Sequence, residues 1–198
     1  DRDAIIFPDE RKTYAELQAA AMLRARELYG QGVRPGDHVG IFLPTCMEYA
    51  EYYFGIAFIG AVSVPMNARY RAEELKYQTL NADLVHIVTT TRIAEGLDFR
   101  ERLYEAFPAL RNAPVESGVD LPDLPRLRGM TLLVDDPSPG FRSQSVSRGF
   151  AESVDPDLMR MHLEAHAVSL DQPTQLIVGQ PGGPMVDRQN RVSRLHPI

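Results

Sequence analysis

Hydrophobic positions in the first half of the chain follow two different spacings. Over residues 14–30 they recur every three or four positions, which predicts an amphipathic helix, and over 38–43 they form a short apolar run, which predicts a buried strand. Strands that alternate with single helices are typical of βαβ units, so the pattern predicts an α/β fold with a layered parallel sheet. The alternation continues with a nearly all-apolar helix at about 46–60, a strand at 62–66, a helix at 71–80 and a strand at 84–90.

Short polar motifs mark where these elements begin. Thr13 is followed three positions later by Glu16, and Thr45 by Glu48. This spacing predicts two capping boxes, in which the Thr hydroxyl and the Glu carboxylate each accept a hydrogen bond from a free backbone N–H at a helix start. Arg34-Pro35-Gly36-Asp37 predicts a tight turn into the strand that follows, because Pro presets φ and Gly tolerates positive φ.

The second half of the chain is less regular. The proline-rich stretch 114–125 and the Ser/Pro/Gly-rich stretch 135–149 predict surface loops. We divide the chain into residues 1–178, an incomplete layered domain, and 179–198, a divergent polar tail that we expect to be disordered. Within the first part we also expect a strand at 130–134, a helix near 156–166 and a strand at 174–178.

Composition excludes several classes of protein. With 198 residues, 44% of them hydrophobic, the chain is long enough to bury a core. Its formal net charge of −6 argues against a nucleic-acid-binding protein, which normally carries a basic face. The single cysteine, Cys46, excludes an internal disulfide framework and a multi-cysteine zinc site, and we expect a cytoplasmic protein.

No segment has the character of a membrane span or a signal peptide. The longest apolar stretch, 49–66, is interrupted by Glu51 and by residues that end helices, so it predicts a buried helix followed by a strand. The chain starts at Asp1 without a cationic and apolar leader, and we expect it to be either trimmed or a piece of a longer protein.

A glycine-rich segment at 179–184 follows the last expected strand. Backbone N–H groups of Gly179, Gly182 and Gly183 could wrap around a phosphate. No Lys follows to neutralise phosphate charge, and no Ser or Thr is present to hold Mg²⁺. From the residues alone, a plain exit loop is therefore favoured over a working phosphate loop.

Polar residues also follow the expected strand at 62–66. Asn67, Arg69 and Arg71 lie where open α/β sheets bind ligands, and an arginine there could hold a carboxylate or phosphate. The favoured alternative is that these arginines pair with Glu73 or Glu74 on the next helix.

Two further candidates have stronger structural explanations. His162 and His166 have the four-residue spacing of two metal ligands, but no third ligand is evident, so a solvated helix face is favoured. Cys46 lies at a helix start, where the dipole could lower a thiol pKa, but no base accompanies it and small residues often pack there.

Taken together, three segments resemble the N-terminal region of the AMP-forming acyl-CoA synthetases, members of the adenylate-forming superfamily. These segments are Tyr14-Ala15-Glu16-Leu17, Arg34-Pro35-Gly36-Asp37-His38-Val39-Gly40-Ile41 and Ala61-Val62-Ser63-Val64-Pro65-Met66-Asn67. The similarity continues through Glu73-Glu74-Leu75 and 85–90 and covers about residues 5 to 170. The resemblance is specific as a set, although no single motif in it suffices.

The resemblance implies a ligase that joins a carboxylic acid, such as a fatty acid, to ATP as acyl-AMP and then transfers the acyl group to CoA, with Mg²⁺ assisting. The family's phosphate loop, in outline Thr-Ser-Gly-Thr-Thr-Gly-x-Pro-Lys-Gly, would fall at 177–186. Gly179, Gly182 and Pro184 match it, but its hydroxyl positions hold other residues and its lysine position holds Met185. We therefore expect a fragment that does not catalyse adenylation and binds none of these cofactors tightly.

Two explanations remain for the anomalous end of the chain. A frameshift near residue 172 would replace the true loop with unrelated residues, and a divergent short protein that lost the reaction is the alternative. A non-catalytic module that binds an acyl group, a nucleotide or a protein is the second functional hypothesis. An incomplete sheet would also promote self-association through its open edges.

Overall fold

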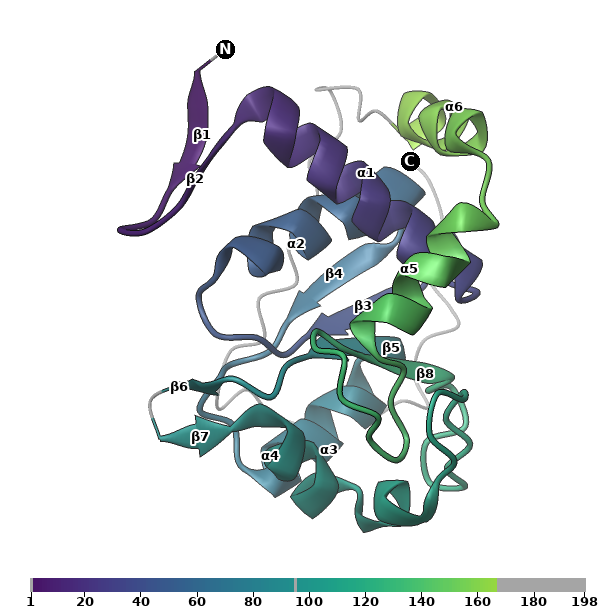
Figure 1. Ribbon diagram of the computed structural model, residues 1–198. Helices are drawn as coiled ribbons and strands as arrows, with labels where there is room; N and C mark the ends of the chain where they lie inside the picture. Colours follow the sequence, from purple (N-terminus) through teal and green to yellow (C-terminus); the bar gives the residue numbers. More distant parts are fainter. Residues whose placement is uncertain (1, 95, 167–198) are drawn as a thin grey trace, which may run out of the picture. The chain divides into compact units, whose positions relative to one another are not determined.

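The computed structural model describes residues 2–94 and 96–166 (Figure 1). The strands are β1 (Asp3–Ile6), β2 (Arg11–Thr13), β3 (His38–Ile41), β4 (Val62–Pro65), β5 (Leu84–Thr89), β6 (Ile93–Ala94), β7 (Leu97–Asp98) and β8 (Gly129–Leu132). The helices are α1 (Tyr14–Gly30), α2 (Met47–Ile59), α3 (Ala72–Asn81), α4 (Phe99–Ala106), α5 (Gln144–Glu152) and α6 (Pro156–His166), with a 3₁₀ helix η1 (Pro108–Asn112) after α4.

The centre of the fold is a four-stranded parallel sheet in the order β4-β3-β5-β8. β3 pairs with both β4 and β5, so that Ile41 lies opposite Pro65 on one side and Val88 on the other. The predicted strands at 38–43, 62–66 and 84–90, their connecting helices and the parallel α/β architecture are therefore confirmed. β1 with β2, and β6 with β7, form separate antiparallel hairpins.

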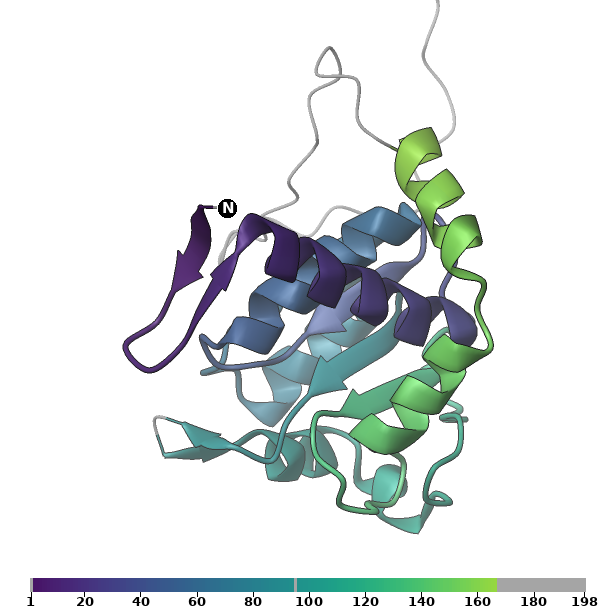
Figure 2. The ribbon, with the colours of Figure 1, turned by 45° about the horizontal axis from the view of Figure 1, so that its top comes forward.

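Helices cover both faces of the sheet, which gives the fold two hydrophobic cores. α1, α2 and α5 lie over one face and α3 and α4 over the other (Figures 1 and 2). Neighbouring residues of β3 alternate between the cores: Ile41 packs with the α1 and α2 side, and Phe42, just after the strand, with the α3 and α4 side. This alternation follows from the two-residue repeat of side chains in extended chain.

α1 and α2 cross at very close range. A Cβ atom on Gly55 would lie 2.7 Å from the carbonyl oxygen of Ala21 and 3.1 Å from the backbone nitrogen of Ala25. Glycine is therefore required at this crossing, because any side chain would press against the backbone of α1.

A buried group of charged side chains joins the same two helices. Arg24 donates from Nε to Glu51 Oε2 at 2.9 Å and from Nη1 to Glu27 Oε1 at 2.8 Å. The hydroxyl of Tyr52 donates to Glu27 Oε2 at 2.8 Å, and Lys12 Nζ donates to Glu51 Oε1 at 2.5 Å. Each buried charge thus has an opposite charge as partner, which offsets the cost of removing these groups from water.

Both edges of the sheet carry features that oppose the addition of a further strand. On β4, the backbone N–H groups of Val62 and Met66 donate to the β3 side, so the backbone groups of Ser63 and Pro65 point away from the sheet. Pro65 has no N–H to offer a further strand, and its carbonyl already accepts from Gln78 Nε2 at 3.2 Å. On β8, the outward backbone groups pair with Arg142. Self-association through a sheet edge stays a prediction, and these features argue against it.

The structure confirms the first capping box and corrects the second. Glu16 N–H donates to the Thr13 hydroxyl at 3.3 Å, and Thr13 N–H donates to Glu16 Oε2 at 2.8 Å. α2, however, begins one residue later than predicted, with Cys46 at the N-cap and no side-chain cap. The shift makes Glu48 the second helical residue rather than the third, and its carboxylate instead binds the Arg92 guanidinium at 2.5 Å.

Two predicted loops also differ from the structure. Residues 144–149 of the expected loop belong to α5, which starts at the N-cap Ser143 and packs against α1 and β8. Ser and Gly lower helix propensity, but this tertiary packing outweighs the loss. The stretch 114–125 has no regular structure, as predicted, yet Val119, Leu121 and Leu124 are buried in the core beside α4.

Several elements were not predicted at all, namely both hairpins, α4 and η1. For α4 the signal was present, because Asp98 accepts from Glu101 N–H at 3.0 Å and the two residues have the spacing of a helix cap. The predicted helix near 156–166 and strand at 130–134 are confirmed as α6 and β8. Among the described residues, no helix is long and apolar enough to cross a bilayer.

Candidate functional site

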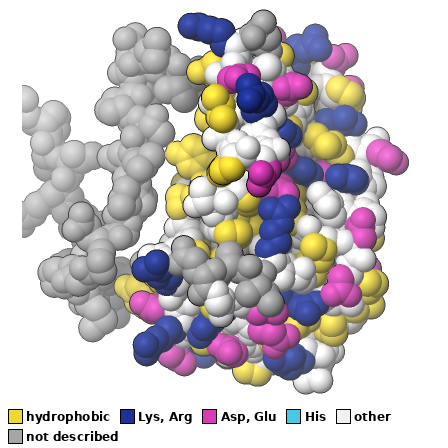
Figure 3. Space-filling view, turned by 60° about the vertical axis from the view of Figure 1, so that its left-hand side comes forward, with side chains coloured by type: hydrophobic (Ala, Val, Ile, Leu, Met, Phe, Trp, Pro, Cys, Tyr) yellow, Lys and Arg dark blue, Asp and Glu magenta, His cyan; other side chains and the backbone are white. Residues whose placement is uncertain are grey.

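The carboxyl ends of the parallel strands border an open cleft of about 1080 Å³. The segments that leave β3 and β4 form its floor, because parallel strands place their carboxyl ends at one edge of the sheet. The β1–β2 and β6–β7 hairpins supply further walls, on the side of the molecule turned forward in Figure 3. This is the ligand position that the βαβ pattern predicts.

The cleft is apolar over much of its surface and carries two cationic side chains. The apolar walls come from Ile5 and Phe7 of the first hairpin, Leu43 and Met66 after the strands, and Leu97 of the second hairpin. Arg69 and Arg102 are the arginines among its lining residues. Such a combination suits an organic anion, with apolar contact for its body and a guanidinium for its charge.

Arg69 lies directly after β4, where the sequence places a candidate ligand contact. Its backbone N–H donates to Asn67 Oδ1 at 2.9 Å, which fixes the turn that presents it to the cleft. Arg71 does not line the cleft; its backbone N–H donates to Glu74 Oε2 at 2.8 Å, where α3 begins. The predicted contact with Glu74 thus involves the Arg71 backbone.

Arg102 was missed by sequence reasoning because α4 was not predicted. It reaches the cleft from α4 while Nη1 binds Glu105 Oε2 at 3.0 Å. Its Nε is buried and has no hydrogen-bond partner among the described residues. A buried donor without an acceptor is costly, but because solvent does not reach this Nε, Arg102 offers a ligand in the open cleft its charge rather than this donor.

Cys46 also lines the cleft but is a poor nucleophile. Burial is the main cause that raises the pKa of its thiol to about 11, and this outweighs a hydrogen bond from the backbone of Tyr49. A thiol activated by the helix dipole, which the sequence already disfavours, therefore gains no support, because removal from water dominates at this position.

The hairpin wall of the cleft is tied to the core by charge. Lys12 on β2 binds Glu51 on α2, and Glu51 in turn holds the buried Arg24. Ile5 and Phe7, which face the cleft from this hairpin, are therefore positioned by an ion pair anchored between the two main helices. No sequence signal joined Lys12 to Glu51, which lie 39 positions apart.

The histidine pair finds no support as a metal site. His162 lies against the ring of Tyr29 with centroids 5.2 Å apart, as a packed surface residue would, and the side chain of His166 is outside the described part. Within residues 2–94 and 96–166, no group of three metal-binding side chains comes together.

The glycines proposed for phosphate binding lie outside the described residues. This holds for Gly179, Gly182 and Gly183 and for the expected strand before them. Their role as a degenerate phosphate loop therefore stays a prediction. What the described part offers to an anion at this end of the sheet is the pair Arg69 and Arg102.

The α/β fold of this chain matches part of the structure of a CoA ligase. A structural match to the anthranilate CoA ligase AuaEII in complex with anthranoyl-AMP has a TM-score of 0.59 at 20% identity. It covers 79% of this chain and 26% of that protein, and at this identity it establishes the fold alone.

Sequence comparison assigns the family. The chain belongs to the AMP-binding enzyme family, which it matches over residues 1–168. It is 39% identical over 95 residues to a medium/long-chain-fatty-acid–CoA/3-oxocholest-4-en-26-oate–CoA ligase of Mycobacterium marinum, covering 48% of this chain and 17% of that protein. It is 32% identical over 133 residues to the acyl-CoA ligase sidI of Aspergillus fumigatus, covering 65% of this chain and 22% of that protein. The chain thus spans about a fifth of the length of these relatives.

Proposed function

We propose that this chain is the N-terminal part of an ATP-dependent acyl-CoA synthetase and that it supplies the scaffold and one wall of the substrate site. The observation that carries the proposal is the family match over residues 1–168, in a chain whose sheet ends in a cleft suited to an organic anion. In the complete reaction a carboxylate oxygen attacks the α-phosphorus of ATP and expels pyrophosphate. The CoA thiol then displaces AMP from the acyl-AMP.

Arg69 contributes a positive charge at this wall. It follows β4 at the carboxyl edge of the sheet and lines the cleft beside apolar side chains such as Met66. A guanidinium there binds an anionic group of a substrate, a carboxylate or a phosphate, while the apolar walls contact its organic part. Which acid is bound, fatty or otherwise, depends on residues of the substrate site other than those of this wall.

Adenylation by the isolated chain is not expected. The positions that correspond to the family's phosphate-loop hydroxyls and lysine hold residues such as Pro181 and Met185, whose side chains can neither donate to phosphate nor neutralise it. Incubation with ATP, Mg²⁺, labelled pyrophosphate and a panel of carboxylic acids should give no labelled ATP above a no-enzyme control. A complete ligase of the family serves as positive control, and acid-dependent exchange by the chain would refute this expectation.

The second candidate is a binding module without catalysis, which the 1080 Å³ cleft favours because it is formed by described residues alone. Thermal unfolding with oleate, AMP or oleoyl-CoA tests it, since a ligand of the folded state raises the melting temperature. The Arg69→Gln variant should lose any such rise, while Arg148→Gln, exposed on α5, should keep it. A rise without exchange activity supports the module; a rise that Arg69→Gln retains contradicts the role of Arg69.

A further inference from the structure

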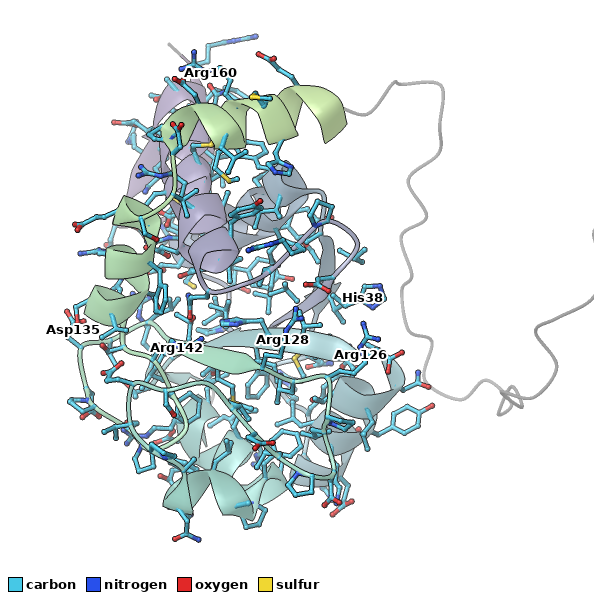
Figure 4. The ribbon with its side chains drawn as sticks, turned by 90° about the vertical axis from the view of Figure 1, so that its right-hand side faces the viewer. His38, Arg126, Arg128, Asp135, Arg142 and Arg160 are labelled. Carbon is cyan, nitrogen blue, oxygen red and sulfur yellow. The ribbon has the colours of Figure 1, made fainter. Side chains whose placement is uncertain are left out.

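A second cationic site lies at the amino end of β8, opposite the cleft. The guanidinium of Arg142 and the ring of the buried His86 both lie beside Gly129, the first residue of β8, and Arg128 directly precedes this glycine. Figure 4 shows Arg142, Arg128 and Arg126 in a row along β8 and the segment that leads into it. The chain as a whole is acidic, with a formal charge of −6, so a local group of arginines is notable.

Arg142 is the central member because its charge is under-compensated. Nη1 donates to the neutral amide oxygen of Gln31 at 3.2 Å, and the guanidinium lies 5.3 Å from the ring centroid of Phe150. Among the described residues it forms no ion pair with a carboxylate, whereas Arg128 binds Asp37 at 2.6 Å. The carboxylate of Glu116, whose charge acts on Arg142, already accepts a hydrogen bond from Ser143 N–H at 2.8 Å.

The backbone around Arg142 is shaped to admit its guanidinium. A Cβ on Gly129 would lie 2.8 Å from Arg142 Nη1 and 2.9 Å from His86 Nδ1, and one on Gly118 would lie 3.3 Å from Arg142 Nη2. Two glycines thus leave the space that the planar group occupies. Burial lowers the pKa of Arg142, and the charge of Glu116, which forms no ion pair with it, offsets this effect only in part.

We propose that Arg142, assisted by Arg128, binds a phosphate group at the amino end of β8. The guanidinium of Arg142 offers paired N–H donors, a geometry that matches the oxygens of a tetrahedral oxyanion. Arg128 keeps its bond to Asp37 and adds positive charge at longer range. This site shares no residue with the cleft, so it stands or falls independently of the proposed function.

Thermal unfolding of the chain in sodium phosphate tests the proposal against sodium chloride at matched ionic strength. The wild-type chain should show a saturable rise in melting temperature with phosphate beyond that with chloride. Arg142→Gln should weaken phosphate binding at least tenfold, and Arg142→Lys should retain part of it because charge remains without the planar fork. Arg148→Gln, on the same segment but exposed, should behave as wild type.

A second measurement separates binding from folding and identifies the source of the phosphate. Broadening of the ³¹P resonance of inorganic phosphate, and of glycerol 3-phosphate, is recorded with each variant after circular dichroism has shown it to be folded. Equal broadening of both compounds indicates a free-phosphate site, and stronger broadening of the ester indicates a phosphomonoester ligand. No phosphate-specific effect in the wild type, or an equal effect in folded Arg142→Gln, would overturn the proposal.

Discussion

Replacing Gly55 with Ala tests whether the close crossing of α1 and α2 limits the stability of the fold. The added Cβ would lie 2.7 Å from the Ala21 carbonyl oxygen, and ordinary contact begins at 3.4 Å, so the helices must separate by about 0.7 Å. Overpacking of this kind costs about 3 kcal/mol at a site bounded by backbone. Alanine returns about 1 kcal/mol through its higher helix propensity, which leaves a net loss of about 2 kcal/mol.

The matched control for this change is Gly149→Ala in α5. A Cβ at Gly149 would meet no atom within 4 Å, so only the propensity gain of about 1 kcal/mol remains. For a chain of this length the melting temperature should fall by about 4–8 °C for Gly55→Ala and rise by about 2–4 °C for Gly149→Ala. Both are measured by circular dichroism at 222 nm. A Gly55→Ala variant at or above the wild-type melting temperature would refute the packing argument.

Three further predictions follow from the buried groups. Burial is the main cause that lowers the pKa of His86 to about 3, below its usual 6.5. The free energy of unfolding should therefore be highest above pH 6.5, where the imidazole is neutral in both states, and should fall by about 2–3 kcal/mol by pH 4.5 because the unfolded chain binds the proton more readily. Urea unfolding at pH 7 and 4.5 should show a smaller fall for His86→Gln, and an equal fall would contradict this cause. Tyr52→Phe removes the hydroxyl that binds Glu27 and should cost about 1–3 kcal/mol in urea unfolding; unchanged stability would mean that this bond contributes nothing. Cys46, whose thiol pKa burial raises to about 11, should react with iodoacetamide at pH 8 about 100-fold more slowly than free cysteine, and equal rates would show that the thiol is not buried as described.

Much of the fold could be predicted because its strongest signals are local. The strands at 38–43, 62–66 and 84–90 and the helices between them have unambiguous hydrophobic spacing, and each is confirmed within one or two residues. α5 was missed because its Ser and Gly residues indicate a loop, while the contacts that stabilise it come from α1 and β8. The second capping box was wrong because α2 begins one residue later than predicted, and the Glu48 carboxylate binds the Arg92 guanidinium instead of a backbone N–H at the N-cap.

The candidate site was predicted only in part. Arg69 could be found from its place after a strand, because the edge at which parallel strands end is fixed by their direction. Arg102 and the hairpin residues Ile5 and Phe7 could not, since they join the cleft through folding of segments distant in sequence.

By itself the sequence determined the alternation of strands and helices, and with it the parallel sheet and the family resemblance. Both depend on residue spacing along the chain, which can be read from the sequence without knowing any tertiary contact. Only the tertiary structure decided which charges meet: Lys12 with Glu51, Arg24 with Glu27, and Arg142 with no carboxylate among the described residues. Electrostatic energy depends on distance and burial in space, and neither quantity is encoded in any local pattern of residues.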